Sequence, residues 1–146
     1  MYLTQPLHKA KRERPDAEAI VFGERRHSFA AHVERVARLA GVLQNLGMGT
    51  GDRVGILALN SDRYIEFIFA ALWGGGVFNT VNIRWSAREA VYSLDDCGTG
   101  ILLVDDAFLS MIEPIRAQSD AVHTIVYIGE NDCPEGALDY RELMAA

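Results

Sequence analysis

The sequence predicts an α/β fold, in which a parallel-rich sheet is flanked by helices and follows an N-terminal β-hairpin. Three observations support this class. Segments with the apolar spacing of helices alternate with strand-like runs from residue 28 to about 128, which is typical of a parallel sheet with helices on its faces. The strand-like runs are almost wholly apolar, as in strands covered on both faces. A hairpin pattern precedes them at residues 20–28.

The first predicted elements are the hairpin and a long helix. Ile20–Phe22 reads as one strand, Gly23-Glu24 as the turn and Arg26–Ser28 as the returning strand. Ser28 can cap the helix that follows, and Gly47 can end it in the left-handed conformation. Steps of three and four residues predict its inward face, which contains Phe29, Val33, Val36, Ala40 and Leu43.

The central part of the chain is predicted to form a strand, a helix and a second strand. The run RVGILAL at 53–59 is typical of a buried strand. Asn60, Ser61 and Asp62 are candidate caps for the next helix, which Gly74–Gly76 end before a strand at 77–83. The apolar stripe of this helix contains Tyr64, Phe67, Ile68, Ala71 and Leu72.

The rest of the chain repeats this alternation. Ser86 and Glu89 have the spacing of a capping box, and the helix they begin continues through Ala87, Val91 and Leu94 to Gly98. Pro114 is expected to end or kink the helix in which it lies, whose inward residues are Phe108, Met111, Ile112 and Ile115. The remaining segments are a strand at 100–106, a helix from about Ala107, a strand at 124–128, a loop at 130–136 and a short helix at 140–144.

Composition indicates a globular chain, since 49% of its residues are apolar and 23% are charged. The net charge of −6 disfavours nucleic acid or an anionic membrane as a partner. The basic cluster Lys9, Lys11, Arg12 and Arg14 is expected to be a solvated arm, with a binding patch as the alternative. The most apolar window, 64–81, is broken by Glu66 and three glycines, whereas a membrane span needs about twenty apolar residues.

The two cysteines indicate a reducing compartment. Cys97 and Cys133 are far apart and lack the spacing of metal ligands. With no apolar signal core at the N-terminus, this pattern predicts reduced thiols and a cytoplasmic protein.

Two short motifs invite a functional interpretation. The glycine-rich stretch 47–51 lies between a helix and a strand, which is the reverse of the order in a phosphate-binding loop. A helix exit is therefore expected, with Asp52 and Arg53 in local contacts. Asp105 and Asp106 end a strand, where receiver domains hold Mg²⁺, but no lysine follows them in this chain. A strand exit and a helix cap are favoured, and a receiver-like module stays as a third hypothesis.

Other polar residues lack a catalytic arrangement. His8, His27, His32 and His123 have no metal-ligand spacing, and His32 is expected at the surface. No serine has the setting of an esterase nucleophile. Arg84 and Trp85 could hold an anion, although a packed Trp beside a solvated Arg is favoured. The sequence therefore predicts no catalytic, cofactor-binding or metal-binding residue in this chain.

The order of these pieces resembles the start of the AMP-forming acyl-CoA synthetases, which belong to the adenylate-forming superfamily. The resemblance covers nearly the whole chain and rests on the ordered set. Ala31 departs from it, because an acidic residue is usual there. The matching pieces are Arg14-Pro15-Asp16, Ser28-Phe29, Leu46-Gly47, Gly51-Asp52-Arg53-Val54, Asn60-Ser61, Gly76 and Asn82-Ile83-Arg84.

The resemblance implies the large N-terminal domain of the adenylate-forming fold, and a parent that uses ATP, Mg²⁺ and CoA to convert a fatty or aromatic acid to its CoA thioester. The phosphate-binding loop ending in Pro-Lys-Gly and the adenylation lysine are not found before Ala146. No catalytic residue is carried over, and adenylation by this chain alone is not expected.

We therefore expect one incomplete N-terminal segment of an AMP-binding domain over residues 1–146, with an arm at 1–18 and the alternating elements at 19–146. The first hypothesis is a fragment of an acid–CoA ligase. The alternative is a non-enzymatic α/β module of the same descent that binds or oligomerises. An exposed sheet edge favours pairing with the rest of the ligase chain or with a second copy.

Overall fold

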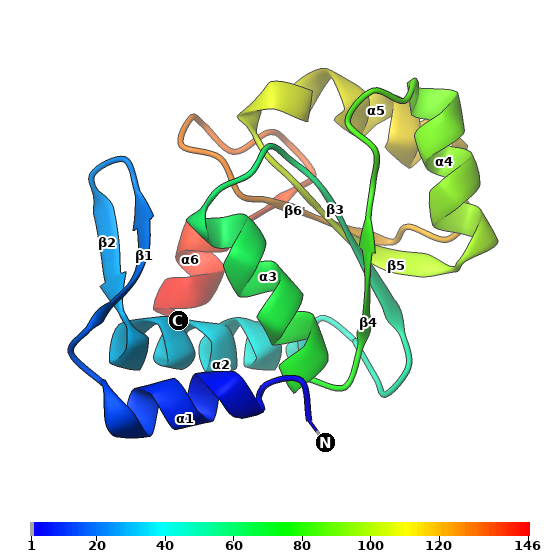
Figure 1. Ribbon diagram of the computed structural model, residues 1–146. Coiled ribbons are helices and arrows are strands. Elements are labelled where there is room, and N and C mark those ends of the chain that lie inside the picture. The colour runs from blue at the N-terminus through cyan, green and yellow to red at the C-terminus, as the bar shows by residue number, and fades with distance from the viewer. Residues whose placement is uncertain (1) are drawn as a thin grey trace.

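The computed structural model describes residues 2–146 and has three layers, with a five-stranded parallel sheet between two layers of helices (Figure 1). The hairpin strands are β1 (Glu18–Phe22) and β2 (Arg25–Ser28), and the sheet contains β3 (Arg53–Leu57), β4 (Val77–Thr80), β5 (Thr99–Val104), β6 (Thr124–Tyr127) and β7 (Leu138–Asp139). The helices are α1 (Gln5–Glu13), α2 (Phe29–Asn45), α3 (Asp62–Trp73), α4 (Ala87–Asp96), α5 (Leu109–Gln118) and α6 (Tyr140–Ala145), with a 3₁₀ turn at Asp106–Phe108.

The strand order is β4-β3-β5-β6-β7, and the predicted fold class is confirmed. The chain passes from β3 to β4 on one side and then crosses back to β5 on the other side of β3. Helix α3 makes the first connection on one face of the sheet, and α4 makes the second on the opposite face. The crevice between the carboxyl ends of β3 and β5 is thus the topological switch point.

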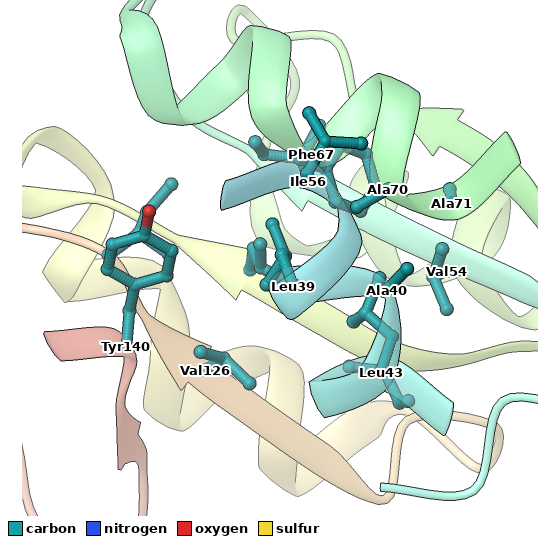
Figure 2. Close-up of a cluster of buried hydrophobic side chains, with 14 of the residues drawn as sticks. Leu39, Ala40, Leu43, Val54, Ile56, Phe67, Ala70, Ala71, Val126 and Tyr140 are labelled. Atoms are coloured by element: carbon teal, nitrogen blue, oxygen red, sulfur yellow. The ribbon is translucent and has the colours of Figure 1, made fainter. Parts of the chain in front are cut away.

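Two hydrophobic cores cover the two faces of the sheet because side chains alternate along each strand. Val54 and Ile56 of β3 pack with α2 and α3, while Leu57 packs with α4 and α5. Figure 2 shows the larger core, where Leu39 and Phe67 lie over the sheet from α2 and α3. None of the described helices is long and apolar enough to cross a membrane.

Glycines end helices α2 and α3 in the same way. In α2, Gly47 has φ +109° and donates to Gln44 O, while Met48 donates to Leu43 O. In α3, Gly75 has φ +86° and donates to Leu72 O, while Gly76 donates to Ala71 O. These paired bonds are the Schellman motif, which satisfies carbonyls at a helix end and favours glycine at the left-handed position. The predicted ends of both helices are confirmed.

The predicted N-caps are confirmed as well. Ser28 Oγ accepts the N–H of Ala31 at 3.1 Å, without a capping box. Ser61 Oγ accepts the N–H of Tyr64 at 3.3 Å. At the start of α4, Ser86 and Glu89 form the complete capping box.

Two helical predictions were incomplete or wrong. The arm before residue 18 contains α1, which packs on α2 through the buried Leu7. Pro114 neither ends nor breaks α5, which continues to Gln118. Pro114 is the sixth of ten residues in α5 and has no N–H to donate to Ser110 O, but Ile112 and Ile115 on either side of it are buried in the core, and their packing favours a continuous helix.

Strand predictions were right in position but differ at their ends. β3 stops at Leu57 and β4 at Thr80, because the residues that follow leave the sheet for the loops at its carboxyl edge. The strand expected at 100–106 spans 99–104. The edge strand β7 was not predicted, since two residues are too few to show a periodic pattern.

Gly55 occupies a crowded position in β3, where a methyl group would lie 2.9 Å from Thr99 Cγ2 and 3.1 Å from Leu102 Cδ1. Gly55→Ala is therefore expected to lower the free energy of unfolding by about 1–3 kcal/mol. The matched control is Gly41→Ala in α2, where nothing lies within 4 Å of the added carbon and alanine should stabilise the helix by up to about 1 kcal/mol. Urea unfolding of both variants measures the contrast, and equal effects would contradict it.

Candidate functional site

The glycine-rich stretch 47–51 is a helix exit and turn, as predicted. Gly49 donates its backbone N–H to Asp52 Oδ2 at 2.7 Å, and Arg53 donates to Gly51 O at 3.2 Å. The motif leads into β3 instead of a helix N-terminus, so its amides are not arranged around an anion.

The crevice at the carboxyl ends of β3, β5 and β6 is where an α/β sheet usually places its ligands. A cleft of about 340 Å³ lies there. Its walls come from the hairpin and from the loops that follow the three strands, and they include Phe22, Arg25, Asn60, Asp105, Asp106 and Glu130.

Asp105 and Asp106 act as structural acceptors in this crevice. Asp105 accepts the N–H groups of Leu59 at 2.8 Å and Ala107 at 3.1 Å. Asp106 accepts from the Tyr127 hydroxyl and from the N–H of Glu130 at 2.7 Å. Burial raises the pKa of Asp105, whereas for Asp106 these bonds outweigh burial and lower its pKa. Because protein donors engage both carboxylates, the predicted strand exit and cap are confirmed and a receiver-type Mg²⁺ site is not supported.

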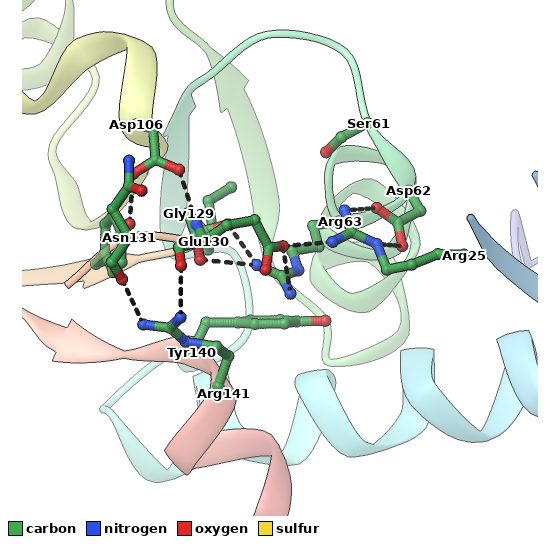
Figure 3. Close-up of polar contacts among 12 residues, drawn as sticks. Arg25, Ser61, Asp62, Arg63, Asp106, Gly129, Glu130, Asn131, Tyr140 and Arg141 are labelled. Atoms are coloured by element: carbon green, nitrogen blue, oxygen red, sulfur yellow. Dashed lines mark hydrogen bonds and ion pairs between the residues drawn. The ribbon is translucent and has the colours of Figure 1, made fainter. Parts of the chain in front are cut away.

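Beside this crevice lies an ionic network, which we define as Arg25, His27, Arg35, Asp62, Arg63, Glu66, Glu130 and Tyr140. Its outer part joins the hairpin to α3 (Figure 3). Asp62 is 1% exposed and receives two bonds from Arg25, Nε–Oδ2 at 2.9 Å and Nη2–Oδ1 at 2.7 Å. His27 Nε2 lies 3.2 Å from Asp62 Oδ2. Burial alone would raise the pKa of Asp62, but these partners outweigh it and the pKa is lowered.

The inner part of the network joins α2, α3 and α6. Glu66 is fully buried and binds Arg35 and the Tyr140 hydroxyl. Arg63 donates to Ile128 O at 2.8 Å and lies over the Tyr140 ring at 4.8 Å. Burial and the Glu66 charge raise the pKa of Tyr140, which keeps its phenol protonated as a donor. The network therefore secures the hairpin and the C-terminal helix to the core.

His27, Asp62 and Glu66 also form a group compact enough to hold a metal ion, with ligand atoms within 4.8 Å of one another. Arg25 and Arg35 already neutralise the two carboxylates of this group. A divalent cation there would have to displace both guanidinium groups, so the residues fit an ion-pair network better than a metal centre.

The environments of His32 and Trp85 differ from those predicted. His32 is 2% exposed, so its predicted surface position was wrong: α2 turns it towards Phe69 of α3, and burial lowers its pKa. Trp85 was expected to pack but is 37% exposed, because the turn after β4, with Trp85 N bonded to Asn82 O, holds it outward. Both cysteines are half-buried free thiols, and burial raises the pKa of Cys133.

The ionic network was missed because the sequence was read for apolar periodicity alone. The observed buried face of α3 contains Asp62, Arg63, Glu66, Phe67, Ala70 and Ala71. It is thus rotated from the predicted stripe, of which Tyr64 and Ile68 are only half-buried. One sequence pattern could have indicated the network. Asp62 and Glu66 are four residues apart, a spacing that places both carboxylates on one face of the helix.

Comparison with known proteins gives a consistent result. The family model described as "AMP-binding enzyme" matches residues 7–144. A long-chain-fatty-acid–CoA ligase of Thermus thermophilus is 38% identical over 119 residues, which is 82% of this chain and 22% of the relative. An acetate–CoA ligase of Humulus lupulus is 29% identical over 92% of this chain and 25% of its own length. The chain thus spans about a fifth to a quarter of these relatives.

Solved structures share the fold. The anthranilate CoA ligase AuaEII matches 95% of this chain and 27% of its own, with a TM-score of 0.89 and 27% identity. The N-terminal domain of FACL13 from Mycobacterium tuberculosis matches 96% of this chain with a TM-score of 0.82. Because the family model covers residues 7–144 and solved CoA ligases share the fold, the chain belongs to the AMP-binding enzyme family.

Proposed function

We propose that this chain is the N-terminal segment of an acid–CoA ligase, which converts a carboxylic acid, ATP and CoA to an acyl-CoA, AMP and pyrophosphate. The observation that carries the proposal is the family match over residues 7–144 in a chain that spans only 22% of its Thermus relative. A fatty acid is favoured as the substrate because that relative is a long-chain-fatty-acid ligase. The anthranilate ligase keeps an aromatic acid as the alternative.

In this proposal the segment has a structural role and is not catalytic alone. The carboxylates in and beside the crevice are engaged by arginines, backbone N–H groups or Tyr127; they are Asp62, Glu66, Asp105 and Asp106. The two lysines of the chain, Lys9 and Lys11, lie in α1, and none lies near the crevice. These residues do not fit ATP or CoA, so the groups that activate the acid are assigned to the rest of a longer chain.

We further propose that the parent works in the cytoplasm with its thiols reduced. Cys97 and Cys133 are both free in the structure and belong to different parts of the fold. Disulfides are rare in that compartment.

The test combines activity with the length of the natural polypeptide. The purified 146-residue chain is incubated with ATP, Mg²⁺, CoA and a panel of fatty and aromatic acids, and the release of AMP and pyrophosphate is measured. We expect no release above the enzyme-free blank, and acyl-adenylate formation would refute the non-catalytic role.

The intact mass in the native cell separates the two hypotheses about the parent. A much heavier chain, with a Ser/Thr/Gly-rich loop ending in Pro-Lys-Gly beyond Ala146, supports the ligase segment. A native mass near 16.1 kDa supports the non-enzymatic module instead.

A further inference from the structure

Helix α1 presents a basic surface at the periphery of the molecule, beside α2 (Figure 1). On its inner side, Leu7 is buried in the larger core, and the His8 ring lies 4.6 Å from the ring of Trp73 in α3. Around the helix axis, Lys9 and Arg12 lie about 160° and about 140° from Leu7. These contacts therefore hold α1 with Lys9 and Arg12 turned towards solvent.

Two exposed apolar side chains lie next to these cations. Tyr2 is 78% and Leu3 is 66% exposed, and they are two of the three most exposed large apolar residues of the described chain, 2–146. Both line a groove of about 690 Å³ together with Lys9 and Arg12. No acidic residue in the part of the chain that the structure describes lines this groove. We call Tyr2, Leu3, Lys9 and Arg12 the α1 patch.

The charges of the chain are segregated between its N-terminal arm and the rest. Residues 1–17 contain four of the 14 basic and two of the 20 acidic residues, so the arm has a net charge of +2 and the remainder of −8. Lys9 forms no ion pair within residues 2–146, and Arg12 has only a 3.9 Å contact with the exposed Glu13. The α1 patch is thus a basic surface with little internal compensation on an acidic protein.

We propose that the α1 patch docks on the surface of an anionic phospholipid bilayer, with α1 lying along the plane of the membrane. Lys9 and Arg12 contact the headgroup phosphates, where each cation is attracted by the negative surface potential. Leu3 and the ring of Tyr2 enter the headgroup region, and the Tyr2 hydroxyl stays in the wet layer, as is usual for tyrosine at membrane interfaces.

The shape of the partner explains how an acidic chain can bind an anionic surface. A bilayer meets one side of the molecule only, and exposed charges beyond a Debye length of about 8 Å at physiological ionic strength are largely screened. A bilayer is favoured over nucleic acid because Leu3 gains from lipid but not from a phosphate backbone. The inference concerns the 146-residue chain itself and does not depend on the proposed ligase activity.

Cosedimentation with lipid vesicles tests the docking. The chain is mixed with vesicles of phosphatidylglycerol and phosphatidylcholine in equal parts, or of phosphatidylcholine alone. We expect reversible binding to the first that added NaCl weakens, and no measurable binding to the second. Lys9→Glu/Arg12→Glu should raise the Kd at least about twentyfold, because each cation near an anionic surface contributes about fivefold in affinity and each reversal adds repulsion.

Two further double variants separate charge from apolar contact. Arg84→Glu/Arg88→Glu is the matched control, since it makes the same change in net charge at two exposed arginines beside Trp85, on the opposite face of the sheet from α1. It should change the Kd by less than about twofold. Tyr2→Ser/Leu3→Ser keeps every charge and should raise the Kd about tenfold, because it removes the two side chains that enter the headgroup region.

Fluorescence supplies an independent readout. Brominated phosphatidylcholine in the anionic vesicles should quench the emission of Tyr2→Trp more than that of the parent chain, whose tryptophans are Trp73 and Trp85. Circular dichroism verifies that each variant keeps its fold.

Four results would overturn the proposal. They are no binding to the anionic vesicles, a loss in Lys9→Glu/Arg12→Glu no larger than in the matched control, unchanged binding of Tyr2→Ser/Leu3→Ser, and equal quenching of Tyr2→Trp and the parent chain. Binding of a single-stranded oligonucleotide in place of the vesicles would assign the α1 patch to nucleic acid instead.

Discussion

Replacing Arg35 with Met is expected to lower the free energy of unfolding by about 3 kcal/mol or more, because it leaves the Glu66 carboxylate buried without its cation. Glu66 is fully buried and depends on Arg35 and Tyr140 for its partners. The Tyr140 hydroxyl can still donate one bond in the variant, but it supplies no positive charge. Chemical denaturation monitored by circular dichroism measures the loss.

Two variants show whether the loss comes from the stranded charge. Arg35→Met combined with Glu66→Leu removes both ionic groups and should be more stable than Arg35→Met alone. Arg26→Met breaks an exposed pair with Glu18, whose side chains are 62% and 50% exposed, and should cost at most about 1 kcal/mol. If Arg35→Met lowers the free energy of unfolding no more than Arg26→Met does, the pair of Arg35 and Glu66 does not stabilise the fold as described.

Asp62→Asn is expected to lower the free energy of unfolding by about 1.5–3 kcal/mol near neutral pH, which is the usual range for hydrogen bonds to a charged group. The substitution weakens the contact by which the hairpin is held to α3, since Asp62 receives two bonds from Arg25. Arg25 retains Glu130 as a partner, which makes the effect smaller than at Arg35.

The pH dependence identifies the carboxylate as the cause. The pKa of Asp62 is lowered from its ordinary value of 3.8 in the folded chain. Its stabilisation is therefore complete above the unfolded pKa and is lost as pH falls through the folded pKa. The stability gap between the parent chain and Asp62→Asn should be present at about pH 5 and should narrow below about pH 4. A gap that is constant down to acid unfolding would contradict this assignment.

Local patterns were sufficient to predict most of the fold. Ser28, Gly47 and the Ser86–Glu89 box determine helix ends through contacts within a few residues, so they can be read from the sequence. Apolar runs identified the strands because those strands are covered on both faces. Pro114 was misleading because the local rule for helix interiors takes no account of the packing of Ile112 and Ile115 in the core, across which α5 continues.

The ionic network could not be predicted in this way. Arg25 pairs with Glu130, which is 105 residues away in the sequence. No local pattern around either residue predicts this pairing. His32 was placed at the surface because a single polar residue on an apolar helix face carries no mark of burial. The burial and the partners of such side chains depend on how distant elements pack together. The periodicity of apolar residues contains no information about that packing.

The contacts of Tyr140 join parts of the chain that leave the ribosome at different times. Arg35 and Glu66 precede Tyr140 by 105 and 74 residues. At a synthesis rate of about 5–20 residues per second, Glu66 waits about 4–15 s for its phenol partner. During that interval α2 and α3 can associate, but the core beneath α6 stays open to solvent. The native fold is therefore completed only after Tyr140 emerges, and nascent chains shorter than this are the ones that need protection from aggregation.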